Sequence, residues 1–158
     1  MRVLAKALRL ARELAVRSGQ VAALDANDWK LLRRAWVAVA HSRMALWVLP
    51  WRRLGMSINS RPETAPVRPS PTRLEWSVRV VSHAVPYATC LTQALALQRL
   101  LARHGYGAIV QVGACHVDGR FLAHAWVEHD GQSLLGTSED VARYARLFTW
   151  PESQLDRP

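Results

Sequence analysis

Hydrophobic residues recur at helical spacing in two stretches of the first third of the chain. Over residues 2–17, apolar positions three or four apart face a row of cations, which predicts an amphipathic helix. The apolar positions are Leu4, Leu8, Ala11 and Ala15, and the cations are Arg2, Lys6, Arg9 and Arg12. A second helix is predicted to begin at a cap among Asp25, Asn27 and Asp28 and to continue to Leu49, because Pro50 cannot extend it.

A segment rich in Pro, Ser and Thr, residues 57–72, interrupts this helical pattern and is typical of a linker or exposed loop. A short helix is predicted next, over residues 75–85, and Pro86 closes it.

The clearest helical pattern of the chain covers Cys90–His104, where leucines and alanines line one side. Thr89 is a natural N-cap, and Gly105 suits the position just past the last turn. Cys90 is therefore expected in the first turn of this helix.

Three strand-like runs follow, at 107–117, 120–129 and 132–137. Asp-Gly pairs separate them, and an Asp-Gly pair between alternating apolar runs is typical of a two-residue hairpin turn. The pattern predicts a three-stranded antiparallel meander.

Two-residue turns would place His124 opposite Gly113 on one side and opposite Thr137 on the other. A glycine beside His124 leaves room for another group to approach the imidazole. The predicted face of His124 also carries Gln111, Gly113, Cys115, Leu122, Trp126, Leu135 and Glu139. The predicted core face carries Val110, Val112, Ala123, Ala125, Val127 and Leu134.

These elements predict an α+β fold, in which N-terminal helices accompany a Cys-bearing helix packed on a small antiparallel sheet. We expect a helical region over 1–56, a linker or loop over 57–73 and the core over 74–158. The length of 158 residues fits one domain. The 50% hydrophobic content, with seven Trp, favours a folded core over disorder.

The charge balance of the chain favours an acidic partner. Lys and Arg number 21 against 12 Asp and Glu, a net charge of +9. A nucleic acid, an anionic membrane face and an acidic peptide would all fit such a charge.

Cysteine content and hydropathy limit the setting. Two cysteines without a CxxC pair are too few for a disulfide scaffold. The N-terminus lacks the pattern of a signal peptide, and the most apolar stretch, 35–51, falls short of the roughly 20 residues that a membrane span needs. We expect a cytoplasmic protein without a transmembrane segment, for which peripheral membrane contact stays open.

Cys90 and His124 are the candidate catalytic residues. A thiolate is the reactive form of cysteine, and the first turn of a helix stabilises it through free N–H groups and the positive end of the dipole. His124 lies in an Ala-His-Ala-Trp strand and would act as the base of a Cys–His pair. The alternative readings are that Cys90 is a small buried hydrophobe and that His124 is a satisfied core residue.

A zinc site is disfavoured. Cys115, His116, His124 and His129 are close in sequence, but their spacing matches no usual ligand pattern. We expect neither a metal nor another cofactor.

Three motifs resemble those of the lasso-peptide biosynthesis B proteins, which are transglutaminase-like, papain-related leader peptidases. They are the run C-L-x-x-A-L-A-L-x-x-L-L-x-x-x-G at Cys90–Gly105, the run A-H-A-W-V-E-x-D-G at Ala123–Gly131, and the helical region Trp29–Gly55. The resemblance covers most of the chain.

The resemblance implies a transglutaminase-like core and removal of the leader from a ribosomally made precursor peptide. Cys90 takes the position of the nucleophile and His124 that of the general base. Many relatives carry an Asp about twelve residues after the His, where this chain has Gly136; Thr137, Glu139 and Asp140 are nearby options, and so is a dyad without a carboxylate.

The same resemblance implies two protein partners. Residues 1–56 show no strand pattern, so leader recognition is expected from a separate protein, and an ATP-dependent cyclase is expected to close the lasso ring. Two other functions stay open: acyl transfer to an amine by the same residues, and non-catalytic peptide or nucleic-acid binding, which charge alone supports. We do not expect nucleic acid as the partner.

Overall fold

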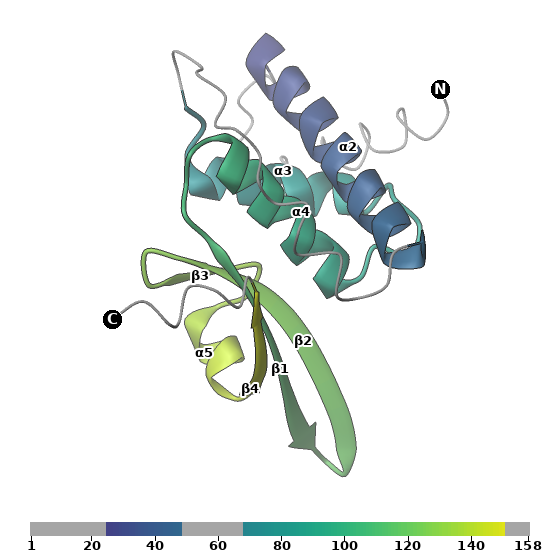
Figure 1. Cartoon of the computed structure of the whole chain (residues 1–158), viewed down its shortest axis with the longest axis vertical. Helices are drawn as coiled ribbons and strands as arrows, with labels where there is room; N and C mark the ends of the chain where they lie inside the picture. The colour runs from purple at the N-terminus through teal and green to yellow at the C-terminus, as the bar shows by residue number, and fades with distance from the viewer. Residues whose placement is uncertain (1–24, 49–67, 151–158) are drawn as a thin grey trace.

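Helices and a four-stranded antiparallel sheet form two adjoining layers in the computed structural model, which describes residues 25–48 and 68–150 (Figure 1). The predicted α+β class is confirmed, with the Cys90 helix packed on the sheet. In chain order the elements are α2 (Ala26–Val48), α3 (Pro71–Ser82), α4 (Cys90–Arg103), β1 (Ile109–Val117), β2 (Arg120–His129), β3 (Gln132–Leu134), α5 (Ser138–Ala142) and β4 (Ala145–Trp150).

Helix α2 begins where its cap was predicted. Asp25 Oδ1 accepts the backbone N–H groups of Asn27 and Asp28, at 2.8 and 2.7 Å, which satisfies two donors that the first turn leaves free. The predicted helix over 2–17 and the stop at Pro50 lie outside the described residues.

Helix α3 begins four residues earlier than predicted, inside the segment expected to be a linker. Ser70 is its N-cap and accepts the N–H of Arg73 at 3.2 Å, and Pro71 occupies the first helical position. Proline is favoured there because it lacks only an N–H that the first turn does not use. Residues 57–67 of the predicted linker lie outside the described residues.

Helix α4 confirms the clearest prediction. Thr89 caps it by accepting the N–H of Thr92 at 3.3 Å, and Cys90 is its first residue. Gly105 follows with a φ of +75°, the left-handed conformation that ends many helices.

The sheet has the order β3-β2-β1-β4, and the register predicted for β1 and β2 is confirmed, with Gly113 opposite His124. The turn residues of both hairpins, 118–119 and 130–131, have positive φ. The predicted pairing of His124 with Thr137 is wrong, because β3 ends at Leu134 and Leu135 turns the chain with a φ of +65°.

Two elements were not predicted from the sequence. Strand β4 pairs with β1, with a register shift between Val112 and Gly113, and α5 connects β3 to β4. Thr137 caps α5, so this residue belongs to a helix start and not to a strand.

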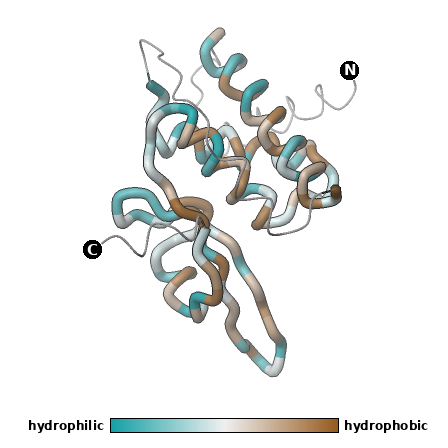
Figure 2. The backbone as a smooth tube through the Cα atoms, in the orientation of Figure 1, coloured by the Kyte–Doolittle hydropathy of each residue, from teal (hydrophilic) through white to brown (hydrophobic). Residues whose placement is uncertain are grey.

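One hydrophobic core joins the helices to the sheet. Its buried members include Val39 of α2, Val78 of α3, Leu97 of α4 and Val127 of β2. In Figure 2 the hydrophobic stretches run through the helices and strands, and hydrophilic stretches lie at the outer turns. Leu135, predicted on the face of His124, follows the end of β3 and is a buried member of this core. Within the described residues, no helix is long and apolar enough to cross a membrane.

Candidate active site

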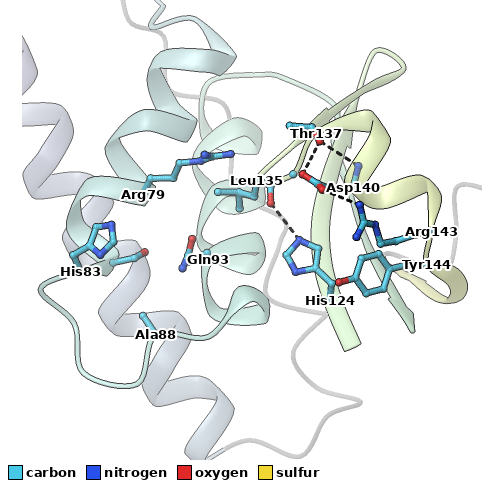
Figure 3. A pocket seen from close by; sticks show the side chains of 12 residues that line it. Arg79, His83, Ala88, Gln93, His124, Leu135, Thr137, Asp140, Arg143 and Tyr144 are labelled. Carbon is cyan, nitrogen blue, oxygen red and sulfur yellow. Dashed lines mark hydrogen bonds and ion pairs between the residues drawn. The ribbon is translucent and has the colours of Figure 1, made fainter. Parts of the chain in front are cut away.

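His124 lies in the middle of β2 and is partly buried. Its Nε2 is 3.3 Å from the backbone carbonyl oxygen of Leu135 (Figure 3). A carbonyl oxygen can only accept, so Nε2 carries the proton in this bond. In the neutral imidazole Nδ1 is then unprotonated, and no described residue forms a hydrogen bond with it. This tautomer leaves Nδ1 available as a base.

An aromatic cluster fixes the plane of the His124 ring. Trp126 is stacked nearly parallel to it with ring centroids 6.3 Å apart, and Tyr144 lies at 5.5 Å. Gly113 permits this packing, because a Cβ there would lie 2.9 Å from Tyr144 Cβ and 3.0 Å from the Trp126 ring. The sequence predicted that Gly113 leaves room for a group to approach the imidazole; in the structure Tyr144 and Trp126 lie against Gly113.

A pocket of about 700 Å³ opens between the helices and the sheet beside His124. Figure 3 shows side chains of the helical layer on one side and those of β2, α5 and the connecting loops on the other. The lining residues are Arg79, Ser82, His83, Ala88, Gln93, His124, Leu135, Gly136, Thr137, Asp140, Arg143 and Tyr144.

Cys90 does not line this pocket, although residues close to it in the chain do. The pocket is lined by Ala88 and Gln93, on either side of Cys90 in the chain, whereas Cys90 is partly buried and packs against the core. Within the described residues no hydrogen bond joins Cys90 to His124. The catalytic pairing of Cys90 with His124 therefore stays a prediction.

The start of α4 has the features expected of a nucleophile's position. Thr89 Oγ1 accepts the N–H of Thr92, and its carbonyl accepts that of Gln93. The N–H groups of Cys90 and Leu91 have no hydrogen-bond partner among the described residues. They stay available for an anion at the positive end of the helix.

Of the three nearby options for a third catalytic residue, Asp140 has the best place in the pocket, and Glu139 is exposed and does not line it. Thr137 Oγ1 donates to Asp140 Oδ2 at 2.6 Å. This bond is the main cause that holds the pKa of Asp140 below its ordinary 3.8, and Arg143 and His124 act in the same direction. Asp140 thus supplies a negative charge near His124, while Leu135 supplies the hydrogen bond.

Gly136 marks the place where the resemblance implies an Asp. A Cβ on Gly136 would lie 3.6 Å from His124 Nε2, so a side chain at this position would extend beside the imidazole. The glycine removes that side chain, and the carbonyl of Leu135 bonds the same nitrogen instead.

Several residues that line the pocket were not predicted from the sequence. Gln93 follows Cys90 by one turn of α4, a spacing that puts two side chains on one face, and this signal could have identified it. Arg79, Arg143 and Tyr144 come from α3 and from the α5–β4 segment, which only the tertiary fold brings to His124.

The histidines considered for zinc make separate contacts. His116 packs on Phe121 near the β1–β2 turn, and His129 Nδ1 donates to the carbonyl of Gly107 at 2.6 Å. Within the described residues no group of three His, Cys, Asp or Glu side chains could hold a metal ion.

A family model described as the transglutaminase-like superfamily matches residues 35–149, which include Cys90 and His124. The chain belongs to the transglutaminase-like superfamily. Members of this superfamily are generally cysteine hydrolases or acyltransferases. No curated protein and no solved structure matches the chain.

Proposed function

We propose that this transglutaminase-like protein is a cysteine peptidase that removes the leader from a ribosomally made lasso precursor peptide. Superfamily membership supports cysteine chemistry, and the motifs at Cys90–Gly105 and Ala123–Gly131 support the narrower assignment. A separate leader-recognition protein and an ATP-dependent cyclase would act with it.

The observation that carries the proposal is the hydrogen bond between His124 Nε2 and the backbone carbonyl of Leu135. Because Nε2 donates to Leu135, Nδ1 is the nitrogen that can take the proton of a thiol. The ring adjoins a pocket large enough for a peptide segment, at the junction with the start of α4.

In the proposed reaction His124 Nδ1 removes the proton of Cys90, and the thiolate attacks the scissile carbonyl. The free N–H groups of Cys90 and Leu91 stabilise the oxyanion. His124 then protonates the leaving amine, and water hydrolyses the thioester. Cys90 must approach His124 when the peptide binds, as is common for catalytic hydrogen bonds that tighten only in the complex.

Precursor cleavage tests the proposal directly. The precursor peptide is incubated with the full chain, with and without the leader-recognition protein, and products are identified by mass spectrometry. We expect cleavage at one position and its loss in Cys90→Ala and His124→Ala. Cys115→Ala is the matched control, because Cys115 is the other partly buried free cysteine and lies on β1 outside the pocket. Full cleavage by Cys90→Ala would refute the proposal.

Members of the superfamily also include acyltransferases. The same assay distinguishes hydrolysis from acyl transfer to an amine. A primary amine added in excess competes with water for the thioester. A peptidase gives mainly the free carboxylate, whereas an acyltransferase gives mainly the amide adduct, which is heavier by the mass of the amine less water.

A further inference from the structure

Leu135 has a backbone conformation that its residue type disfavours. Its φ is +65°, in the left-handed region where a Cβ crowds the backbone and where glycine is usual. Such conformations persist only where the surrounding structure fixes them, and they are often found at functional sites.

Three contacts fix Leu135 in place. Its side chain is buried in the core with 9% exposure. Its N–H donates to Glu75 Oε1 at 2.8 Å, and its carbonyl accepts from His124 Nε2 at 3.3 Å. The two polar bonds connect helix α3 to the imidazole through a single residue.

Glu75 is well placed to anchor this connection. It lies in the middle of α3, its side chain is 17% exposed, and the same Oε1 accepts Arg79 Nη2 at 2.7 Å one turn later. A hydrogen bond from an N–H to a carboxylate is stronger than one between neutral groups. The carboxylate therefore fixes the direction of the Leu135 N–H more firmly than a water molecule would.

We propose that Glu75 is a positioning residue for His124, which it orients through the backbone of Leu135. This inference rests on the proposed function of His124 as the base. Glu75 holds the left-handed turn at Leu135, the turn aims the carbonyl at Nε2, and the carbonyl selects the tautomer with a free Nδ1. Glu75 itself does not touch the substrate.

The tautomer of His124 gives a test that needs no substrate. Nitrogen-15 NMR of the imidazole in the full-length protein, at a pH where the ring is neutral, distinguishes a proton on Nε2 from one on Nδ1. We expect the wild type to hold the proton on Nε2 and Glu75→Ala to show a mixture of both forms. Glu75→Gln keeps an oxygen acceptor of the same reach and should keep the wild-type tautomer. An unchanged tautomer in Glu75→Ala would overturn the inference.

Precursor cleavage adds a second readout. We expect kcat to fall about tenfold in Glu75→Ala and KM to change less, since Glu75 itself does not line the pocket, and Glu75→Gln to restore most of kcat. If Glu75→Ala does not fold, Glu75→Asp replaces it, because the shorter side chain keeps the charge but draws back from Leu135. A Glu75→Asp variant with wild-type tautomer and kcat would equally overturn the inference.

Failure of this inference and failure of the proposed function give different results. Loss of cleavage in Cys90→Ala combined with a normal tautomer in Glu75→Ala would support the peptidase function and contradict the positioning role of Glu75. A disturbed tautomer in Glu75→Ala without any precursor cleavage by the wild type would support the positioning role and contradict the proposed peptidase function.

Discussion

Single residues decide how closely the His124 site can pack, and Gly113 is the tightest of them. It pairs with His124 across the two strands, and an added Cβ would lie 2.9 Å from Tyr144 Cβ and 3.0 Å from the Trp126 ring. An added methyl group would lie 2.9 Å from the backbone oxygen of Ala145, closer than real Cβ atoms come. The aromatic cluster around the imidazole thus depends on the absence of one side chain.

We expect Gly113→Ala to lower the free energy of unfolding by about 1–3 kcal/mol, because over-packing forces neighbouring groups apart. Gly107→Ala is the matched control, since nothing lies within 4 Å of its added Cβ. Urea unfolding of the two variants measures the difference. Equal stability of both variants would contradict the packing around Gly113.

Gly136 allows a gain of function to be tested. We expect Gly136→Asp to place a carboxylate beside His124 Nε2, although Val141 Cγ1, at 3.0 Å from the new Cβ, must shift by a few tenths of an ångström. A hydrogen bond to a charged group stabilises by about 1 kcal/mol more than one to a neutral group, so cleavage should rise roughly fivefold over Gly136→Asn. Gly136→Asn has the same size without the charge. Equal rates in the two variants would show that the carbonyl of Leu135 already suffices.

At the scale of elements, the sequence predicts best where the signals are local. Helix α4 and both hairpins follow from Thr89, Gly105 and the Asp-Gly pairs, all within or next to the elements that they define. Strand β4 was missed because its partner, β1, lies about 30 residues earlier and its own sequence alternates poorly. The turn at Leu135 could not be predicted, since leucine gives no sign of a positive φ and only distant contacts impose it.

For the candidate site, too, the sequence predicts only what local motifs contain. Cys90 and His124 could be identified from short motifs, but the pocket is also lined by Arg79 of α3, by His83 just after α3 and by Arg143 just after α5. No local pattern in the sequence connects the ends of α3 and α5 with the motifs that contain Cys90 and His124. The hydrogen-bond acceptor for His124 is a backbone carbonyl, which residue identity does not reveal.

The cap of α4 gives a prediction at this scale. We expect Thr89→Ala to cost about 1 kcal/mol of stability, because the N–H of Thr92 loses its acceptor, whereas Thr89→Ser keeps the hydroxyl and should cost little. Cleavage should also fall in the alanine variant, since the frayed turn carries Cys90. Chemical unfolding and precursor cleavage measure the two effects. A Thr89→Ala variant as stable as Thr89→Ser would show that the Thr89 cap does not stabilise α4.

For the molecule as a whole, α2 packs on α3 and α4 and so joins the core of the protein. Its junction with α4 contains a buried charge. A polar cluster lies at this junction, where Arg99 Nη1 is 2.5 Å from His41 Nδ1 and 3.4 Å from Ser42 Oγ. Arg99 is buried, with 7% exposure, and its Nε and Nη2 have no hydrogen-bond partner among the described residues. A guanidinium can only donate, so His41 must keep Nδ1 unprotonated to accept this bond.

This cluster makes the stability of the protein sensitive to acid. Burial, together with the positive charges of Arg99 and Arg103, holds the pKa of His41 below its ordinary 6.5. Between the folded and unfolded values the unfolded chain binds more protons, so the free energy of unfolding falls as the pH drops below about 6.5. The contribution of His41 to stability is fully present above that pH and is lost below the folded value.

We expect His41 to account for about 0.5 kcal/mol of the stability that the wild type loses between pH 7 and pH 5.5. The contribution is small because His41 is an exposed residue that is only partly desolvated where it meets Arg99, so solvent screens its interactions. In His41→Gln the side-chain oxygen can accept from Arg99 without titrating, so the decrease should be smaller by that amount. His116→Gln is the matched control, because His116 lies near the β1–β2 turn and outside this cluster. Urea unfolding at a series of pH values gives all three slopes. Equal slopes for His41→Gln and the wild type would mean that Arg99 does not depend on His41 as its acceptor, and that the α2–α4 junction holds its buried cation by other contacts.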